Sequence, residues 1–548
     1  MLGETPNSSQ VQQKPFSLTL TQNLPLSSNK NNNFDILRIY LSDRNFILEG
    51  SDIIKKFAKT VIIVTVLSCF ERTLGFVYRV FLSRSIGSEG LGLYQIALSV
   101  IGLLITISAS GIPITVSRLM IKERTANHLG GDNKAVSAGI IAALAVSIPL
   151  CLFFFLFRGS LDFIFADERC SVLFLIILPG VVLTSVYAVI RGFFWGNKSF
   201  YIYSAIELAE EIMMIVCGIF LISRGQTVFQ KAVYASVAVL LSYVFSFIIS
   251  SASFVAKGGR IINPKEEMRP LISSSMPITF MRTANSLPSS LIAIILPAVL
   301  ITTGIDKQQA ISEFGIISGM ALPLLFIPST LIGSFSLVLS PELSESFYKK
   351  NTEKIRSGVE KSLLYSLLIS ILIVPAFTGT GEYVGEFVYN NHLAGIYVRN
   401  SAFIMIPMSI TIISTSLLNS MGFERKTLKY FLIGAAMLLA CILILPRFIG
   451  SYALIVGYLI NYCVTAVMNV LLLKKVCCNK LDFEKKSLIA LPLCGIACLL
   501  NYLAFNLLKN FMHNFLATGV SCVITFICLI LTLLIFKIFT LKELKIGL

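Results

Sequence analysis

Arginine side chains are the residues of this chain with the clearest chemical potential. Four of them, Arg72, Arg79, Arg191 and Arg282, lie in stretches that are otherwise apolar enough to cross a bilayer. An arginine at the centre of a spanning helix costs about 2.5–3.5 kcal/mol on insertion scales, so each needs a compensating interaction. A guanidinium stays charged at physiological pH and presents a fork of donors that suits phosphate oxygens. The pattern predicts that an anionic substrate binds within the membrane.

The spacing of these arginines indicates a shared face. Arg72 and Arg79 are seven residues apart, so on one helix they project from nearly the same side, about 10 Å apart. Arg282 lies in the corresponding helix of the second half of the chain and is expected to approach the same space from the opposite wall. We predict that Arg72, Arg79 and Arg282 bind substrate. The alternative is that they lock helices together by pairing with carboxylates, namely Glu71, Glu207, Glu210 or Glu211.

A second set of charged residues is predicted to couple an ion or to balance charge. Glu207, Glu210 and Glu211 stand at i, i+3 and i+4 early in one span and therefore share a helix face. Arg191 is near the end of the preceding span, where its side chain can reach the membrane surface. Balancing of Arg191 by the glutamates is the favoured interpretation. Glu71, beside Arg72, is the other candidate for ion coupling.

Prolines gather in the span that carries Arg282. Pro277, Pro288 and Pro297 each remove a backbone donor and favour a kink. We predict a hinge at Pro277 and Pro288. Ordinary tolerance of proline in membrane helices is the alternative.

Composition places the chain among polytopic membrane proteins. Of its 548 residues, 55% are hydrophobic and 14% are charged, and the mean hydropathy is +0.81. A span needs about 20 apolar residues, and about fourteen such segments occur. The apolar runs are continuous rather than alternating, so the predicted fold is all-α. The predicted spans are 57–83, 92–117, 135–157, 172–195, 200–223, 232–255, 271–303, 314–340, 359–381, 396–420, 428–446, 451–473, 487–508 and 515–536.

The net charge of +16 predicts orientation rather than nucleic-acid binding. Most lysines and arginines outside the spans fall in loops on the side of the N-terminus, which the positive-inside rule assigns to the cytoplasm. A multi-pass plasma-membrane protein with both termini cytoplasmic is therefore expected. The opposite loops are short, the histidines are few, and no nucleotide-binding or hydrolase motif is present, so we expect no enzyme, no cofactor and no metal.

The spans repeat along the chain. Gly92-Leu-Tyr and the apolar run after it resemble Phe314-Gly315-Ile and its run, at an offset of about 225 residues, which indicates two six-helix halves in parallel orientation. Chance likeness between membrane helices is the alternative. The predicted parts are a disordered cytoplasmic tail, a first lobe, a second lobe and a C-terminal helix pair, at residues 1–50, 51–260, 261–475 and 476–548.

One stretch carries a family resemblance. It reads Arg72-Thr-Leu-Gly-Phe-Val-Tyr-Arg79-Val-Phe-Leu-Ser-Arg84-Ser-Ile-Gly-Ser-Glu-Gly-Leu-Gly-Leu-Tyr94. This resembles the polysaccharide-transporter branch of the multidrug/oligosaccharidyl-lipid/polysaccharide (MOP) exporter superfamily, in particular the stage V sporulation protein B group, which is related to lipid II flippases. The resemblance implies fourteen helices in two six-helix lobes around a V-shaped cavity. It also implies that Arg72, Arg79 and Arg282 meet a pyrophosphate.

The favoured function is that of a flippase. By the resemblance, it would move an undecaprenyl-pyrophosphate-linked glycan, a peptidoglycan precursor such as lipid II or a polysaccharide unit, by alternating access. A cation-coupled multidrug exporter of the same superfamily is the second interpretation, and a membrane enzyme acting on lipid-linked sugars is the third. The expected partners are the lipid-linked anionic glycan and membrane lipid, without nucleic acid, and a monomer is expected.

Overall fold

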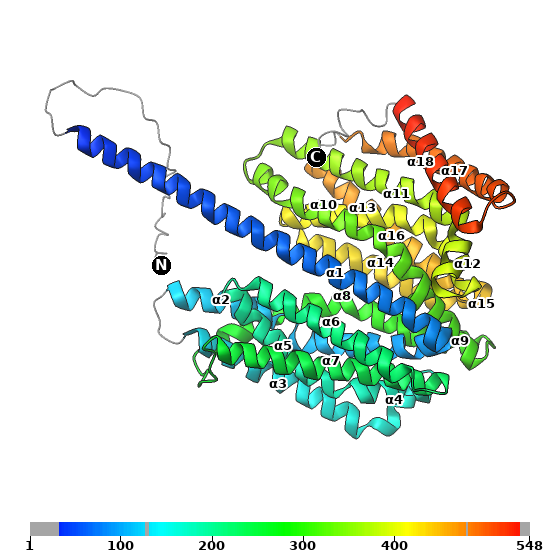
Figure 1. Ribbon diagram of the computed structural model, residues 1–548, viewed down its shortest axis with the longest axis horizontal. Helices are drawn as coiled ribbons and strands as arrows, with labels where there is room; N and C mark the ends of the chain where they lie inside the picture. The colour runs from blue at the N-terminus through cyan, green and yellow to red at the C-terminus, as the bar shows by residue number, and fades with distance from the viewer. Residues whose placement is uncertain (1–31, 126–130, 478–480, 537–548) are drawn as a thin grey trace, which may run out of the picture. The chain divides into compact units, whose positions relative to one another are not determined.

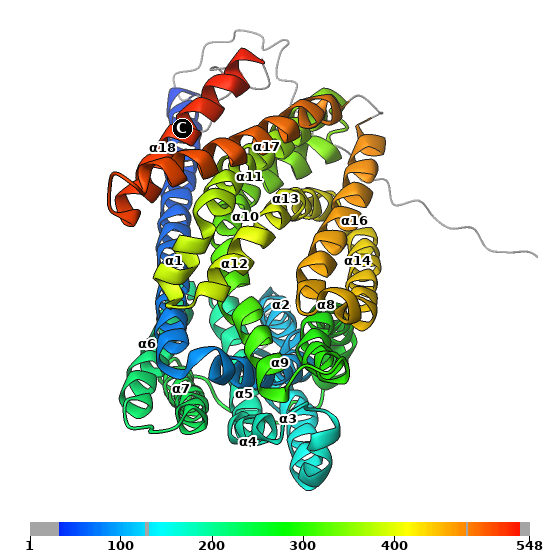
Figure 2. The same ribbon diagram turned by 90° about the vertical axis from the view of Figure 1, so that its right-hand side faces the viewer.

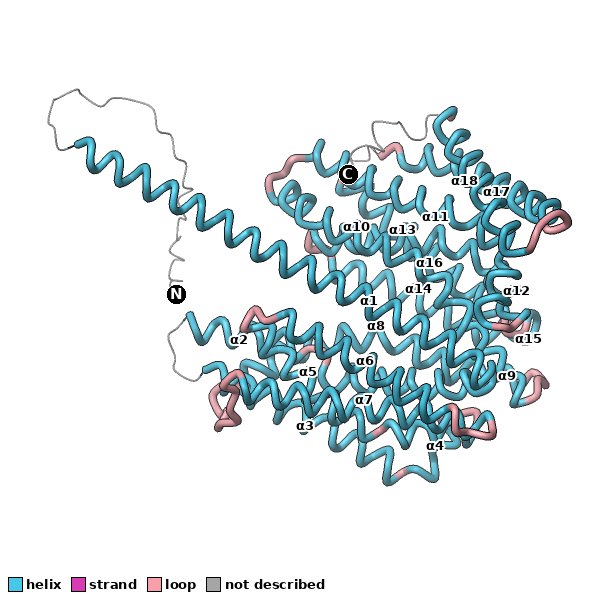
Figure 3. Tube along the Cα trace, viewed as in Figure 1, coloured by secondary structure: helices cyan, strands magenta, loops and turns pink. Residues whose placement is uncertain are grey.

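The computed structural model describes residues 32–125, 131–477 and 481–536, and every element in these ranges is a helix (Figures 1 and 3). The elements are α1 (Asn32–Ala109), α2 (Ile112–Thr125), α3 (Gly131–Leu156), the 3₁₀ helix η1 (Arg158–Phe163), α4 (Glu168–Ile177), α5 (Pro179–Gly196), α6 (Phe200–Ile222), α7 (Val228–Ala256), α8 (Met268–Thr302), α9 (Lys307–Phe314), the π-helix η2 (Gly315–Ala321), α10 (Leu322–Tyr348), α11 (Thr352–Tyr389), α12 (His392–Ser401), the 3₁₀ helix η3 (Ala402–Ile404), α13 (Met405–Ser420), α14 (Glu424–Ile444), α15 (Pro446–Ile449), α16 (Tyr452–Val476), α17 (Phe483–Leu508) and α18 (Asn514–Ile535). The all-α prediction is confirmed for the described residues.

Twelve stretches of the described chain are long and apolar enough to cross a membrane. One of them, Ile63–Thr125, has 63 residues. As a helix it would extend about 95 Å, roughly three times the hydrocarbon thickness of a bilayer. It is interrupted at Gly87, where φ is 70° and ψ is −177°. The helix α6 is not among the twelve and carries Glu207, Glu210 and Glu211. The predicted number of about fourteen spans therefore stays a prediction.

The predicted disordered tail requires a correction. Helix α1 begins at Asn32, so residues 32–50 are helical rather than disordered. Apolar residues recur there within a polar sequence, as in Ile36, Leu37 and Ile39, and this periodicity favours a helix. Residues 1–31 of the predicted tail lie outside the described part of the chain.

The chain divides into two compact units, residues 1–62 and 63–548. Within the second unit, neighbouring helices form two groups. In the first half of the chain, α6 packs on α7, and α5 packs on α2, α3 and α7. In the second half, α14 packs on α16, and α13 packs on α10, α11 and α16. Helix α8 joins the two groups, because it contacts α2 and α3 as well as α14.

The last two helices form a pair. Helix α17 packs along α18 and along α11, as Figure 2 shows. The amide of Asn501 on α17 donates to the hydroxyl of Thr525 on α18 at 3.1 Å, and both side chains are buried. Buried polar contacts of this kind hold helices together where lipid supplies no hydrophobic drive. This arrangement supports the predicted C-terminal pair.

Residues at equivalent positions of the two repeated halves contact each other just beyond Gly87 in the chain. The hydroxyls of Ser88 and Ser312 lie 2.6 Å apart, and the two residues are separated by 224 positions. A methyl group added at Gly92 would lie 2.2 Å from the carbonyl oxygen of Ile311, and one added at Gly315 would lie 2.2 Å from that of Ser88. Contact between equivalent residues is typical of a two-fold axis. The contact supports the prediction of two related halves.

A glycine substitution tests this contact. Gly92→Ala places a methyl group against backbone atoms that cannot rotate away, so we expect a loss of stability of about 1–3 kcal/mol, as for overpacked interiors. Gly102→Ala is the matched control, because nothing lies within 4 Å of its added methyl group. In detergent, the melting temperature of Gly92→Ala should fall by several degrees while that of Gly102→Ala should not. Equal melting temperatures would show that the halves do not meet at Gly92.

Candidate functional site

Helix α1 presents two arginines that form no ion pair with a carboxylate among the described residues. The helix is regular from Ile63 to Ile86, so Arg72 and Arg79 project from one face about two turns apart, as predicted. Arg72 is exposed and Arg79 is half-buried. Among the described residues, neither guanidinium has a carboxylate oxygen within 4.0 Å. Their charges are therefore not locked into ion pairs.

Glu211 approaches α1 between the levels of these arginines. A methyl group added at Gly75 would lie 3.0 Å from Oε1 of Glu211, so this carboxylate of α6 rests against α1. Its charge interacts with those of Glu71 and Arg79. Arg79 also lies within electrostatic range of Tyr389, the last residue of α11. Arg79 is therefore placed where the first half of the chain meets the second.

Arg191 is held by side chains of its own and the next helix. Its Nη1 donates to the hydroxyl of Tyr203 at 2.7 Å and lies 3.8 Å from Oε1 of Glu207. The guanidinium carbon is 5.4 Å from the centre of the Trp195 ring and 5.2 Å from that of Tyr203. Cation–π contacts and an ion pair together stabilise a charge in apolar surroundings. This environment is the one that a charge-balancing arginine needs.

Arg282 is bound to backbone rather than to a carboxylate. Its Nη1 donates to the carbonyl oxygen of Ser110 at 3.0 Å, at the turn between α1 and α2. One helical turn earlier, the hydroxyl of Thr279 accepts from the backbone N–H of Gly111 at 3.1 Å. The charge of Arg282 also lies within range of Arg191. Like charges repel each other, so a negative charge near Arg282 would be favourable.

The three glutamates of α6 reach three different helices. Glu207 faces Arg191 on α5, Glu210 lies near Ser246 on α7, and Glu211 rests on α1. Each of them also interacts electrostatically with Glu71. The carboxylates therefore balance the neighbouring arginines as a group, and among the described residues the ion pair within this cluster joins Arg191 to Glu207.

Some predicted residues are joined by contacts and others are not. Electrostatic interactions connect Glu71 with Arg72 and, through Glu211, with Arg79. A second set connects Glu207, Arg191 and Arg282, and the interaction between Glu207 and Glu71 links the two sets. In the described residues no interaction joins Arg282 directly to Arg72 or Arg79. A single binding site for all three stays a prediction.

The two prolines predicted as a hinge lie in an unbroken helix. Helix α8 continues through Pro277 and Pro288, with Pro277 exposed and Pro288 buried. The hinge therefore stays a prediction.

Sequence reasoning missed the aromatic residues around this cluster. Tyr203 lies one turn before Glu207, and Trp195 one turn after Arg191, a spacing that places each pair on one helix face. That spacing was the available signal. The buried hydroxyl of Tyr187 has no described hydrogen-bond partner, and it lies within electrostatic range of Glu207 and Glu210. No sequence signal pointed to Tyr187.

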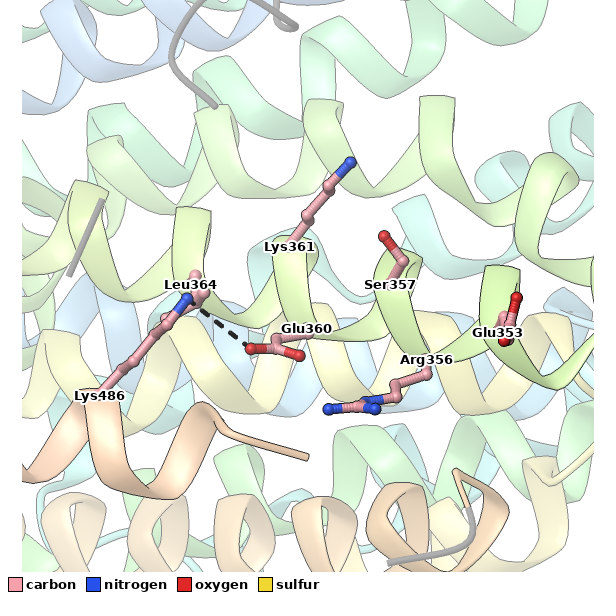
Figure 4. A pocket seen from close by; sticks show the side chains of 7 residues that line it. All are labelled: Glu353, Arg356, Ser357, Glu360, Lys361, Leu364 and Lys486. Carbon is pink, nitrogen blue, oxygen red and sulfur yellow. Dashed lines mark ion pairs between the residues drawn. The ribbon is translucent and has the colours of Figure 1, made fainter. Parts of the chain in front are cut away.

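A separate polar pocket lies between the first turns of α11 and α17 (Figure 4). Its cations are partly paired, because Lys486 is 3.7 Å from Glu360 and Arg356 is 3.2 Å from Asp482. None of the predicted site residues lines it. The residues that line it are Glu353, Arg356, Ser357, Glu360, Lys361, Leu364 and Lys486.

Comparison with known proteins identifies the class. A solved structure titled lipid II flippase MurJ, inward closed conformation, matches with a TM-score of 0.66 at 14% identity, over 87% of this chain and 99% of that one. An inward-facing multidrug resistance MATE family transporter of the MOP superfamily matches with a TM-score of 0.61 at 14% identity, over 74% and 95%. The chain has the fold of these multi-pass membrane transporters. The expectation of a transporter rather than an enzyme is confirmed.

The family follows from the sequence. A family model described as polysaccharide biosynthesis protein matches residues 57–347, more than half of the chain, and the chain belongs to this family. Stage V sporulation protein B of Bacillus subtilis (strain 168) is 27% identical over 362 residues, 63% of this chain and 68% of that protein. Lipid II flippase MurJ of the same organism is 22% identical over 361 residues, 59% and 64%. The resemblance given above is confirmed.

Removal of one hydroxyl tests the environment of Arg191. Tyr203→Phe leaves a partly buried guanidinium short of an acceptor, so we expect a stability loss of about 1–3 kcal/mol. Tyr201→Phe, on the same helix at an exposed position, is the control. The melting temperature in detergent should fall for the first variant only. A similar melting temperature for both would mean that Arg191 does not depend on this hydrogen bond.

Proposed function

We propose that this protein is a flippase for an undecaprenyl-pyrophosphate-linked glycan, a peptidoglycan precursor such as lipid II or a polysaccharide unit. The observation that supports this most is the state of Arg72 and Arg79, which lie in a transporter fold without a carboxylate within 4.0 Å among the described residues. Cations placed within a membrane need an anionic or polar partner. A diphosphate supplies oxygens for the forked donors of both side chains.

In the proposed transport route, the polar headgroup of the substrate stays in water and its polyprenyl tail stays in lipid. The diphosphate would bind Arg72, Arg79 and Arg282 while the glycan remains in water. The polyprenyl tail would stay in the bilayer, along the apolar surface of α17 and α18, whose exposed residues are largely leucine, isoleucine, valine and phenylalanine. The halves would then rock to expose the headgroup on the opposite side. A cation or substrate gradient would drive the cycle.

The proposed topology has fourteen crossings. It counts the parts of α1 and α2 on either side of Gly87 as two spans and includes α6. The lobes comprise residues 51–260 and 261–475, with the pair at 476–548, and both termini face the cytoplasm of a plasma-membrane monomer. Pro277 and Pro288 would let α8 bend, and α8 contacts both groups of helices. Bending there would change the position of Arg282 relative to Arg79.

A cation-coupled multidrug exporter is the second candidate, and the glutamates favour it. Glu71, Glu207 and Glu211 interact electrostatically within one cluster, and carboxylates of this kind bind cations. In this alternative they would exchange Na⁺ or H⁺ for a cationic drug. In the proposed flippase, Glu71, Glu207 and Glu211 balance the arginines, and Arg191 pairs with Glu207.

Loss of the guanidinium at residue 79 should stop lipid transport. We expect transbilayer movement of a fluorescent lipid-linked disaccharide in proteoliposomes to fall about tenfold or more in Arg79→Ala, because a hydrogen bond to a charged group contributes about 1.5–3 kcal/mol. Arg79→Lys keeps the charge without the fork and should retain an intermediate rate. Arg158→Ala, in the loop helix η1, is the control. Full activity of purified Arg79→Ala would refute the proposed substrate site.

Neutralising Glu71 separates the two candidate functions. In the flippase, Glu71→Gln removes an anion beside Arg72, so the substrate should bind as well as before or up to about threefold more tightly, an effect below 1 kcal/mol. In the cation-coupled exporter, the same change removes a coupling group and should abolish transport. The measurement is lipid transport in proteoliposomes together with drug resistance in cells. Loss of drug resistance without effect on lipid movement would favour the exporter.

A further inference from the structure

An arginine of the first half binds the end of a helix of the second half. Nε of Arg84 donates to the carbonyl oxygen of Val388 at 2.9 Å, and its Nη2 donates to that of Phe387. Both carbonyls belong to the last turn of α11, after which Asn390 adopts a left-handed conformation with φ of 54°. The last carbonyls of a helix have no partner within the helix and carry the negative end of its dipole. A guanidinium is well suited to bind them.

Further polar contacts join the halves at the same end of the fold. Beyond Gly87, the hydroxyls of Ser88 and Ser312 are in contact at 2.6 Å. Glu89 then accepts from the Gln308 amide at 2.6 Å and pairs with Arg169 at 2.7 Å. The backbones of the two halves touch immediately afterwards, at Gly92 and Ile311. Backbone contact leaves no space for a substrate to pass between the halves at this point.

The chemistry of this junction suits a contact that opens. Ser88 and Ser312 are half-buried and Arg84 is exposed, so water can replace their hydrogen bonds when the halves separate. Both hydrogen bonds to the end of α11 come from the side chain of Arg84, so movement of this one side chain breaks both. The chain on either side has unusual backbone geometry, namely Gly87 with its positive φ and the π-helix η2, which begins at Gly315. Such irregular turns recur at sites where helices move.

We propose that Arg84 is the latch of the outer gate: it holds the end of α11 against α1 in the closed arrangement and releases it when this end opens. The assignment of this end to the outside rests on the proposed function and its topology. Arg84 is a positioning residue, which sets the balance between closed and open states without binding substrate. The residues Ser88, Glu89, Gln308 and Ser312 form the seal behind the latch.

The latch can be tested without any substrate. Ser88→Cys introduces a thiol into the seal, and a membrane-impermeant maleimide added outside intact cells reports its opening, with labelling read by mass spectrometry of the peptide that carries it. We expect Arg84→Ala to raise the labelling rate about tenfold, because two hydrogen bonds to a charged group are lost. Arg84→Lys, which keeps the charge but not the fork, should give a smaller rise. Arg158→Ala should give none.

Two outcomes would overturn the latch. One is an unchanged labelling rate in Arg84→Ala when the melting temperature shows a folded protein. The other is labelling only from the cytoplasmic side in inverted vesicles, since the gate would then be an inner one. Neither outcome depends on lipid transport. The wild-type protein could fail to move lipid while Arg84→Ala still raises the labelling rate. This result would refute the proposed flippase function but would support the proposed role of Arg84.

A crosslink tests whether the seal must open during the cycle. The close approach of Ser88 and Ser312 makes the double variant Ser88→Cys/Ser312→Cys a suitable pair. After oxidation, transport in proteoliposomes should fall to background, and a reductant should restore it. Each single variant is the control. Undiminished transport by the oxidised, fully crosslinked protein would show that this contact persists throughout the cycle, which contradicts a gate.

Discussion

The cost of a charge inside a membrane is the constraint on which this structure depends. The chain meets it in different ways for different arginines. Arg191 has a hydroxyl, a carboxylate and two aromatic rings around it, and Arg282 has a backbone carbonyl. Arg72 and Arg79 have no such contacts among the described residues. Arg191, with a carboxylate partner, is thus balanced within the fold, whereas Arg72, Arg79 and Arg282 have no carboxylate within 4.0 Å among the described residues and fit the proposed binding of an anion. The presence or absence of a carboxylate partner therefore separates Arg191 from the three arginines proposed to bind substrate.

The carboxylates show the same division of roles. The glutamates of α6 raise its polarity enough to separate it from the apolar spans, and each one reaches a different neighbour. They reduce the repulsion between the arginines without an ion pair to Arg72 or Arg79. A tight pair would compete directly with a phosphate group, and a distant carboxylate competes less because its interaction falls with separation. Charge balance at a distance is thus compatible with binding of an anion.

Much of the fold was predictable from the sequence because apolar length and helical spacing are local properties. The spacing of Arg72 and Arg79 and the offset that brings Ser88 to Ser312 were visible without coordinates. The contact of Arg84 with α11 could not be predicted from the sequence. Arg84 binds backbone carbonyls more than 300 positions away, and every residue has such a carbonyl whatever its side chain. Helix formation from Asn32 was also missed, because the polar composition of the tail obscured a weak periodicity. The placement of Trp195 beside Arg191 depended on rotamers that a sequence does not specify.

Arg79 and Arg84 lie five residues apart on the regular part of α1, before its break at Gly87. Arg79 is within electrostatic range of Tyr389, and Arg84 binds the two residues before it, so both arginines lie near the end of α11. An α-helix transmits displacement along its axis with little loss. If the proposed function holds, a diphosphate that attracts Arg79 acts on the same rigid segment that carries Arg84. Substrate binding and release of α11 would then be coupled mechanically through one helix, without a separate pathway between site and gate.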